Sequence, residues 1–334
     1  MTTATAPTLG VDPKGKFAMR RVALIYNPAS GQHSVGRHAA IDKALAVIRA
    51  AGVKVDAMET LAPGSAGILA KDAVRRGCDT IFACGGDGTV HEVLQSLVGT
   101  NVALGVVPLG TANALAKNLG LHSTPAKAVR TLLTAEPVRF SVGKISYSDD
   151  TGATCSRYFT VAAGVGADAL FLSRLDPSLK RRLGYVLYVI EAFRVWATHS
   201  FPLFEAAFVE RESAQPRVEE ISELLAVRIR DFGGVLNNMV PGASLHKNGL
   251  RLVAFKTRSR FRYFCFLISV VLGRQKFSGD IELLDAVSVE CRPRKGSLTR
   301  VFAEADGELL GNLPVRIEVV PDAVTLLIPP DAKP

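Results

Sequence analysis

The stretch CGGDGTVHEV, residues 84–93, stands where a short apolar run ends and a helical pattern begins. Residues 79–83 have the composition of a buried strand, and apolar residues from Thr89 onward recur at helical spacing. Glycine lets a backbone turn sharply and approach a ligand that a side chain would keep away. Amide N–H groups at the start of the following helix favour an anion, as does the helix dipole. The stretch therefore predicts a phosphate-binding turn.

Asp87 is the unexpected residue in this turn, because a carboxylate repels phosphate unless a cation lies between them. A nucleoside triphosphate carrying Mg²⁺ resolves the conflict, with Asp87 near the metal ion or its waters. The alternative is that GGDGT (85–89) is only a tight turn between a strand and a helix.

The first third of the chain alternates between strand and helix patterns. Strand patterns lie at 21–26, 53–59, 80–83 and 103–107, and helix patterns lie at 36–51 and 65–76, closed by Gly52 and Gly77. This order predicts a parallel sheet covered by helices on both faces. Ligands of such sheets bind at the carboxyl ends of the strands. Three glycine-bearing loops fall there: NPASG (27–31), GGDGT (85–89) and PLGTAN (108–113).

The pattern changes after about residue 137, where alternating strands predict a larger, mostly antiparallel β-rich domain. These strand patterns lie at 138–147, 157–163, 201–209, 224–231 and 250–257, with helix patterns at 180–196 and 259–273. We therefore expect a flexible segment at 1–20, an α/β nucleotide-binding domain at 21–136 and a β-rich domain at 137–334.

Composition limits the class of protein. A chain of 334 residues with 48% hydrophobic residues and a mean hydropathy of +0.22 can form two cores. No apolar run reaches the length of a membrane span, and residues 1–20 do not resemble a signal peptide. Five scattered cysteines without a CxxC pair indicate reduced thiols and a cytoplasmic location. The net charge of +9 suits nucleic acid, an anionic membrane or phosphorylated ligands.

Several other motifs in the sequence are weaker signals of a site. GQHSVGRH (31–38) has Walker A spacing, but Arg37 and His38 stand where a P-loop needs Lys and Ser or Thr. GVGADA (164–169) lacks the final glycine of a dinucleotide motif and is interpreted as a turn. His91 is a candidate base, although a polar anchor for the loop is the favoured interpretation. The histidines do not cluster at metal-ligand spacing.

Four motifs together resemble the diacylglycerol kinase catalytic-domain superfamily. They are NPASG, ACGGDGTVHEVLQSL, LGVVPLGTANALAKNLGL and EADGELLGNLPVRIEVVPDAVTLLIP, and they cover the chain from about residue 21 to 329 in the family's order. The chain looks like the bacterial lipid kinase branch, which is similar to sphingosine and ceramide kinases. The resemblance implies an NAD-kinase-like or diacylglycerol-kinase-like fold whose segment 313–329 returns to the first domain. It also implies that ATP and lipid meet between the domains.

The resemblance also implies roles for particular residues. Nucleotide contacts are implied for Asn27, Ser30, Gly31, Thr60, Gly85, Gly86, Asp87, Gly88, Thr89, His91, Glu92, Gly110, Thr111 and Asn113. Asp87 is also implied as a catalytic residue that acts through Mg²⁺, by way of water or the nucleotide phosphate. Asp306 and Glu308 of ADGE are catalytic candidates, one of them taking the proton from the lipid hydroxyl. The alternative for DGE is a β-turn.

The sequence departs from the relatives at several positions. Gln32 replaces a lysine that often follows NPxSG, and Ala114 replaces an acid. Residues 246–248 replace acids that bind a structural Mg²⁺ in some relatives, so we expect that site to be absent. The basic run 180–182 is a candidate to compensate for the lysine, or is a solvated surface.

Residues 258–277, RSRFRYFCFLISVVLGRQKF, combine an apolar centre with basic flanks. Such a segment suits peripheral binding to an anionic membrane, and an amphipathic helix that covers a sheet would look much the same. Three functions follow: an ATP-dependent lipid kinase, a soluble-substrate kinase of the NAD-kinase type, or a non-catalytic nucleotide- or lipid-binding regulator. We expect the first, located in the cytoplasm, peripherally on the membrane, with homo-oligomerisation left open and no nucleic-acid partner.

Overall fold

The computed structural model describes residues 17–30, 36–121, 124–149, 151–167, 169, 198, 200–211, 215–232, 239–274, 277, 279–330 and 332. The chain separates into two compact units. Unit 1 comprises Met1–Val142 and Pro321–Pro334, and unit 2 comprises Gly143–Val320. The first change of unit falls inside a single strand, β5 (Glu136–Ser148).

Unit 1 is built on a parallel sheet. Its strands, in the order β15-β4-β3-β1-β2, are the end of β15 (Glu308–Ile328), β4 (Ala103–Pro108), β3 (Thr80–Gly85), β1 (Arg21–Tyr26) and β2 (Lys54–Glu59). The connecting helices are α1 (Arg37–Ala50), α2 (Ser65–Arg75), α3 (Asp87–Leu97), α4 (Ala114–Asn118) and α5 (Pro125–Leu133). All neighbouring strands of this set pair in parallel.

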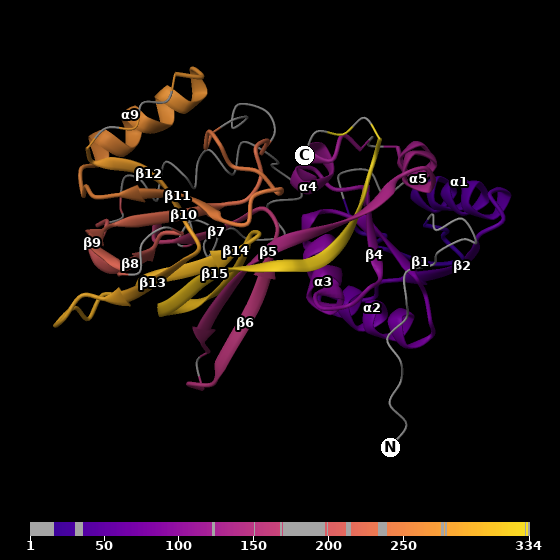
Figure 1. Ribbon diagram of the computed structural model, residues 1–334, viewed down its shortest axis with the longest axis horizontal. Coiled ribbons are helices and arrows are strands. Elements are labelled where there is room, and N and C mark those ends of the chain that lie inside the picture. The colour runs from indigo at the N-terminus through magenta and orange to yellow at the C-terminus, as the bar shows by residue number, and fades with distance from the viewer. Residues whose placement is uncertain are drawn as a thin grey trace. The chain divides into compact units, whose positions relative to one another are not determined.

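Burial explains why these segments form central strands. All six residues of β3 and of β4 are buried, as the continuous apolar runs of a doubly covered parallel sheet require. Helix α1 packs with α5 and α2 packs with α3, and Figure 1 shows the two pairs on opposite sides of the sheet. Gly52 and Gly77 adopt positive φ angles of 75° and 77° just after α1 and α2, which confirms them as helix-ending residues.

The C-terminal end of β15 belongs to unit 1. Thr325 pairs with Ala103 of β4, and the Arg139 guanidinium donates to the Thr100 carbonyl, the Thr325 hydroxyl and the Asp322 carbonyl. The chain that ends unit 2 therefore completes the sheet of unit 1.

Unit 2 is antiparallel and β-rich. Its further strands are β6 (Thr154–Phe159), β7 (Ala162–Val165), β8 (Phe204–Val209), β9 (Arg217–Ile221), β10 (Glu223–Val227), β11 (Leu250–Phe255), β12 (Ile281–Ala286), β13 (Ser288–Pro293) and β14 (Phe302–Ala305). The main order is β12-β11-β10-β7-β14-β15, while β13 pairs with β15 and β8, and β8 pairs with β9 (Figure 1). Helix α9 (Arg260–Val271) lies beyond β11 and β12. These two units confirm the predicted fold class.

Several predicted elements differ from the structure. The strands expected at 201–209 and 224–231 are the shorter β8 and β10. The strand expected at 157–163 is two strands, because the N–H groups of Thr160, Val161 and Ala162 are bound by Asp306 instead of continuing one ladder. Helix α3 begins at Asp87, two residues before the start of the expected pattern. The helix expected at 180–196 lies outside the described residues, together with the basic run 180–182.

Candidate functional site

The three glycine-bearing loops of unit 1 leave the sheet at one edge. Tyr26 is paired with Cys84, and Gly85 with Pro108, so β1, β3 and β4 end side by side. The amide of Asn27 donates to the Cys84 carbonyl at 3.1 Å, and that of Leu109 to the Gly85 carbonyl at 2.8 Å. The loops predicted to converge therefore do so at the carboxyl ends of the strands.

Two of these loops touch through glycines. A Cβ atom added to Gly110 would lie 2.5 Å from the Cα of Gly86, and one added to Gly86 would lie 3.3 Å from the Cα of Gly110. The first distance is shorter than real Cβ atoms tolerate, and the neighbour is backbone that cannot rotate away. Only glycine at position 110 allows this approach, which is the physical reason for the G of PLGTAN.

Asp87 holds the same two loops together. Its carboxylate accepts hydrogen bonds from the backbone N–H of Asn113 at 2.9 Å and of Ala114 at 2.7 Å, at the start of α4. Negative charge at a helix N-terminus is favourable, and charged acceptors form the stronger hydrogen bonds. Asn113 has a φ of 50° and its side chain accepts from the Gly110 N–H and donates to the Gly110 carbonyl, both at 2.8 Å. The carboxylate thus positions the PLGTAN loop against α3.

Glu92 performs the same task one turn further along α3. Its two carboxylate oxygens accept from the N–H groups of Gly64 at 2.7 Å and Ala66 at 2.9 Å, at the start of α2. Thr60 follows β2 and is buried, and its N–H donates to the Tyr26 carbonyl at 2.9 Å. The structure therefore gives Glu92 a contact with backbone that the sequence did not indicate.

The remaining residues of GGDGT differ in exposure. Gly88 is exposed in the first turn of α3, and a Cβ there would meet nothing within 4 Å. Thr89 is buried, and its hydroxyl lies 2.4 Å from where a Cβ on Gly85 would stand. His91 is also buried, and Gln95 contacts its ring and donates to its carbonyl. Both of these contacts lie within α3, so the role of His91 as a base or as an anchor for the loop stays a prediction.

The thiol of Cys84, which ends the strand before the motif, is not suited to nucleophilic chemistry. Its side chain is fully buried, and burial raises the pKa of the thiol well above its usual range. The strand end therefore contributes its backbone to the site.

The NPASG loop is ordered by its first residue. The side-chain oxygen of Asn27 accepts from the Ala29 N–H at 2.8 Å, and its carbonyl accepts from the Ser30 N–H at 3.2 Å. Gly31 and Gln32 lie outside the described residues. Thr111 is exposed at the rim of the PLGTAN loop.

Asp306 and Glu308 lie on the hairpin that joins β14 to β15 in unit 2. Asp306 and Gly307 have φ angles of 48° and 86°, the positive values of a tight hairpin turn. The two carboxylate oxygens of Asp306 accept three backbone N–H groups, from Thr160 at 3.0 Å, Val161 at 2.9 Å and Ala162 at 3.0 Å. Glu308 is half-buried and is the first residue of β15. The geometry therefore gives Asp306 a positioning task.

Two buried acids that the sequence did not indicate also accept hydrogen bonds from backbone N–H groups. Glu304 accepts from the Gly307 N–H at 2.9 Å, and Glu223 accepts from the Ala167 N–H at 2.7 Å, where GVGADA turns. Both side chains are at most 5% exposed. Their burial, which a sequence pattern does not report, is what distinguishes them from surface acids.

No cluster of three or more metal-type side chains occurs among the residues that the structure describes. The loop at 245–249 is instead held by a buried arginine. Arg228 donates to the carbonyls of Leu245, Lys247 and Gly249, and desolvation lowers its pKa to about 10.

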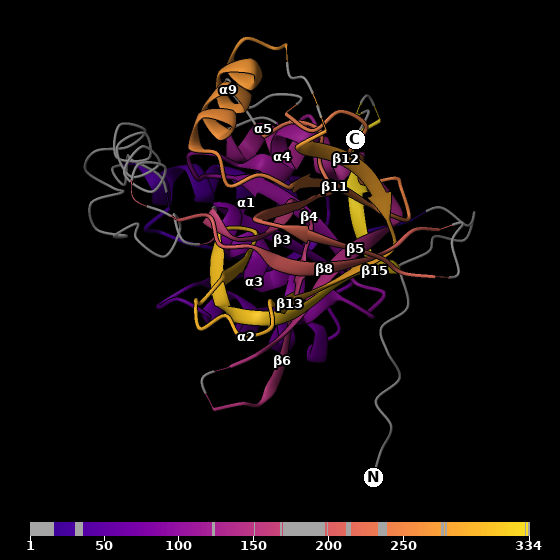
Figure 2. The same ribbon diagram turned by 90° about the vertical axis from the view of Figure 1, so that its left-hand side faces the viewer.

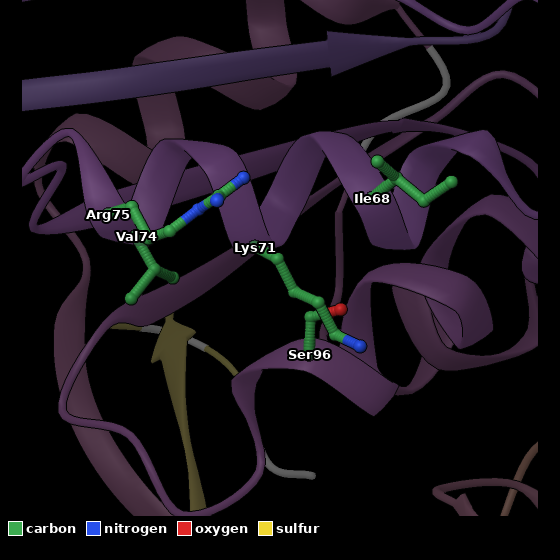
Figure 3. A pocket seen from close by; sticks show the side chains of 5 residues that line it. All are labelled: Ile68, Lys71, Val74, Arg75 and Ser96. Atoms are coloured by element: carbon green, nitrogen blue, oxygen red, sulfur yellow. The ribbon is translucent and has the colours of Figure 1, made fainter.

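A hollow of about 420 Å³ is lined by residues of α2 and α3. Figure 3 shows its lining of Ile68, Lys71, Val74 and Arg75 from α2 and Ser96 from α3. Ser96 donates to the Gly67 carbonyl and joins the two helices. The lining is mainly apolar and presents no acid, so we assign the hollow no part in the chemistry.

Comparison with known proteins agrees with this geometry. Residues 21–145 match the diacylglycerol kinase catalytic domain, and residues 159–328 match the YegS C-terminal NAD kinase beta sandwich-like domain. A diacylglycerol kinase of Bacillus subtilis is 28% identical over 71% of this chain and 74% of its own length. A probable lipid kinase YegS-like of Chromohalobacter salexigens is 35% identical over 43% and 45%.

Solved structures show the same fold. The crystal structure of a putative diacylglycerol kinase from Bacillus anthracis superposes with a TM-score of 0.75 at 20% identity, covering 96% of this chain and 99% of that one. The likeness confirms the predicted diacylglycerol-kinase-like fold, and the C-terminal domain that is matched carries the NAD kinase sandwich in its name. The chain belongs to the diacylglycerol kinase catalytic-domain superfamily, in its bacterial lipid kinase branch.

Proposed function

We propose that this protein is an ATP-dependent lipid kinase that transfers the γ-phosphate of ATP to the hydroxyl of a diacylglycerol or sphingoid-type lipid. The observation that carries the proposal is the close backbone contact between Gly86 and Gly110, next to the start of α3. Family membership supports the choice of a lipid over a soluble acceptor.

The residues present fit a nucleotide phosphate. The first N–H groups of a helix lack partners within the helix, and Gly86 and Gly88 add no side chain beside them. Asn27, Ser30, Thr60 and Thr111 supply polar groups on the neighbouring loops of unit 1. We propose that these residues bind the nucleotide, while Thr89, His91, Glu92 and Asn113 keep the loops in shape.

Mg²⁺ is the cation we expect with ATP, since it neutralises the charge on the phosphates during transfer. Both oxygens of Asp87 already accept backbone N–H groups. We therefore propose that Asp87 faces the metal only through water or phosphate, and that its first task is to fix the loop.

For the acceptor, we propose that Glu308 takes the proton from the lipid hydroxyl. The carboxylate of Asp306 already accepts hydrogen bonds from three backbone N–H groups, which suits a residue that orients the hairpin. A base within hydrogen-bond reach of the hydroxyl usually accounts for about 10²- to 10⁴-fold in rate.

An acceptor panel with γ-labelled ATP tests the proposal. We expect label in lipid, with Mg²⁺ required, for diacylglycerol or a sphingoid base, and no label in NAD. Label in NAD alone would favour a soluble-substrate kinase. ATP binding without transfer to any acceptor would favour a non-catalytic regulator. Because the proposed acceptor is a lipid, we also propose that the protein works at the surface of an anionic membrane.

A further inference from the structure

Helix α9 is apolar on the face that points away from unit 2 as well as on the face that packs against it. Of the ten large apolar side chains that are exposed in the described part of the chain, five belong to this helix and the residue after it. They form what we call the outer stripe: Phe261 (72% exposed), Phe264 (43%), Leu267 (46%), Ile268 (43%) and Leu272 (65%). Positions 261, 264, 268 and 272 are three or four residues apart, so they lie on one side of the helix.

The inner face of α9 explains why the helix forms but leaves the outer stripe unexplained. Tyr263, Phe266 and Val270 are buried, and the Tyr263 ring stacks on Phe255 with centroids 4.6 Å apart. The Tyr263 hydroxyl lies 2.8 Å from the Ser222 hydroxyl. A helix that only covered a sheet would be polar outside. The outer stripe is therefore exposed on a helix whose opposite face packs against unit 2, and both Figure 1 and Figure 2 show α9 at the edge of unit 2.

The exposed arginines around the outer stripe indicate what kind of partner it binds. Arg258 and Arg260 are exposed at the start of α9, and Arg274 is exposed just after its end. Arg262 pairs with Asp280, and the sequence from 258 to 274 contains no acid. A stripe of aromatic and aliphatic side chains between exposed arginines matches an interface of acyl chains and anionic headgroups.

The helix is too short to enter a bilayer end-on. Twelve residues of helix extend roughly 18 Å, against about 30 Å of hydrocarbon. No helix among the described residues is long and apolar enough to cross a membrane. The stripe therefore suits a helix that lies flat in the headgroup region.

We propose that the outer stripe of α9 is a membrane-docking surface, inserted at the boundary of headgroups and acyl chains of an anionic bilayer, with Arg258, Arg260 and Arg274 against the phosphates. This inference rests on the proposed function, because it names the surface through which a lipid kinase meets its substrate. Ala162, whose N–H donates to Asp306, packs against the apolar cluster beneath α9. One sheet, β12-β11-β10-β7-β14, thus carries both the docking helix and the acceptor hairpin.

Flotation of the full-length protein with vesicles tests the inference. Phosphatidylcholine vesicles with and without phosphatidylglycerol are compared for the wild type and for Phe261→Gln/Phe264→Gln/Ile268→Gln. We expect the wild type to bind the anionic vesicles, more weakly as salt rises, and the triple variant to bind at least about tenfold more weakly. Replacing Arg258, Arg260 and Arg274 by Gln should weaken binding to anionic vesicles and flatten the salt dependence.

A matched control removes three exposed apolar side chains elsewhere. Ile68→Gln/Val218→Gln/Leu298→Gln changes residues that are 67%, 62% and 99% exposed, and should bind vesicles as the wild type does. Equal binding of the stripe variant, the control variant and the wild type would overturn the inference. So would a wild-type dimer that the stripe substitutions convert to monomer without an effect on vesicle binding, since the stripe would then join two copies.

Kinase activity on a water-dispersed short-chain diacylglycerol separates this inference from the proposed function. We expect the stripe variant to keep the wild-type kcat on that substrate while losing activity on vesicles. A wild type that binds anionic vesicles through the stripe but phosphorylates no lipid supports docking and contradicts the proposed function. A wild type that phosphorylates the dispersed lipid but does not bind vesicles supports the proposed function and contradicts docking.

Discussion

Replacing Gly110 by alanine tests whether the contact between the two glycine loops shapes the nucleotide site. The added Cβ would stand 2.5 Å from the Gly86 Cα and 2.9 Å from the Asn113 Oδ1, whereas ordinary contact begins at 3.4 Å. The difference from 2.5 Å requires the loops to separate by about 0.9 Å. No rotamer relieves the clash, because the atom it meets is backbone.

Asp87 resists this separation. Its hydrogen bonds to the N–H groups of Asn113 and Ala114 are 2.9 and 2.7 Å long, so a shift of that size along them would break both. Forced overpacking of this kind costs about 1–3 kcal/mol of stability. A displacement of about 1 Å in a positioning loop costs roughly 10²-fold in rate. We therefore expect Gly110→Ala to lower the unfolding free energy and to reduce kcat/KM for ATP by about 10²-fold.

Two further glycine variants are compared in urea unfolding and ATP titration, and Gly279→Ala is the control. Gly279→Ala meets nothing within 4 Å and should leave both measurements unchanged. Gly88→Ala is equally unobstructed, and alanine in a helix is favoured by roughly 0.5–1 kcal/mol, so stability should hold or rise. ATP affinity should fall, because the methyl group would stand where phosphate approaches α3. Wild-type ATP affinity and stability in Gly110→Ala would refute the reasoning.

The remaining predictions concern acids. Asp87→Asn should lower the unfolding free energy by about 1–3 kcal/mol and turnover by orders of magnitude, because the asparagine NH₂ group would face one of the two backbone N–H donors that Asp87 accepts. Full stability in urea unfolding would contradict the positioning role. Glu308→Gln should lower kcat about 10²-fold with little change in ATP affinity, whereas Asp306→Asn should also destabilise the protein; an unchanged kcat for Glu308→Gln would exclude it as the base. A hydrogen bond from Arg217 lowers the pKa of Glu282 to about 2, from 4.5. The stability that this ion pair contributes is present above pH 4.5 and is lost as the pH falls toward 2. Glu282→Gln should therefore lower the unfolding free energy by about 1 kcal/mol at pH 7 and reduce the further loss of stability in acid. Equal acid slopes in urea unfolding of the two proteins would contradict it.

The sequence predicted the parallel sheet and the convergence of its loops because both depend on local signals. Apolar runs such as 80–83 and glycines at strand ends are visible within a few residues. The closing glycines Gly52 and Gly77 follow the same rule, since their positive φ angles are a property of the turn itself.

The partners of the acids could not be predicted. Asp87 binds backbone N–H groups 26 and 27 residues away, and Asp306 binds groups 144 to 146 residues away. Every residue except proline has a backbone N–H, so a backbone donor leaves no mark in the sequence. The sequence indicated that Asp87 and Asp306 matter, and the folded chain shows that each organises a neighbouring loop.

Helix α9 illustrates a different limit. Its apolar residues were plain in the sequence, but periodicity alone could not separate a helix that covers a sheet from one that binds a membrane. The burial of Tyr263 and Phe266, together with the exposure of Phe261 and Leu272, is the observation on which the proposed membrane docking rests.

The central claim is phosphoryl transfer to a lipid hydroxyl, and the most direct measurement is the identity of the product. Full-length protein is incubated with ATP, Mg²⁺ and vesicles containing diacylglycerol, and the extracted lipid is analysed by mass spectrometry and phosphorus NMR. The account predicts a new lipid phosphate monoester, formed in equal amount to ADP and strongly reduced in Gly110→Ala and Glu308→Gln. ADP released with inorganic phosphate alone, or unchanged lipid beside phosphorylated NAD, would contradict it.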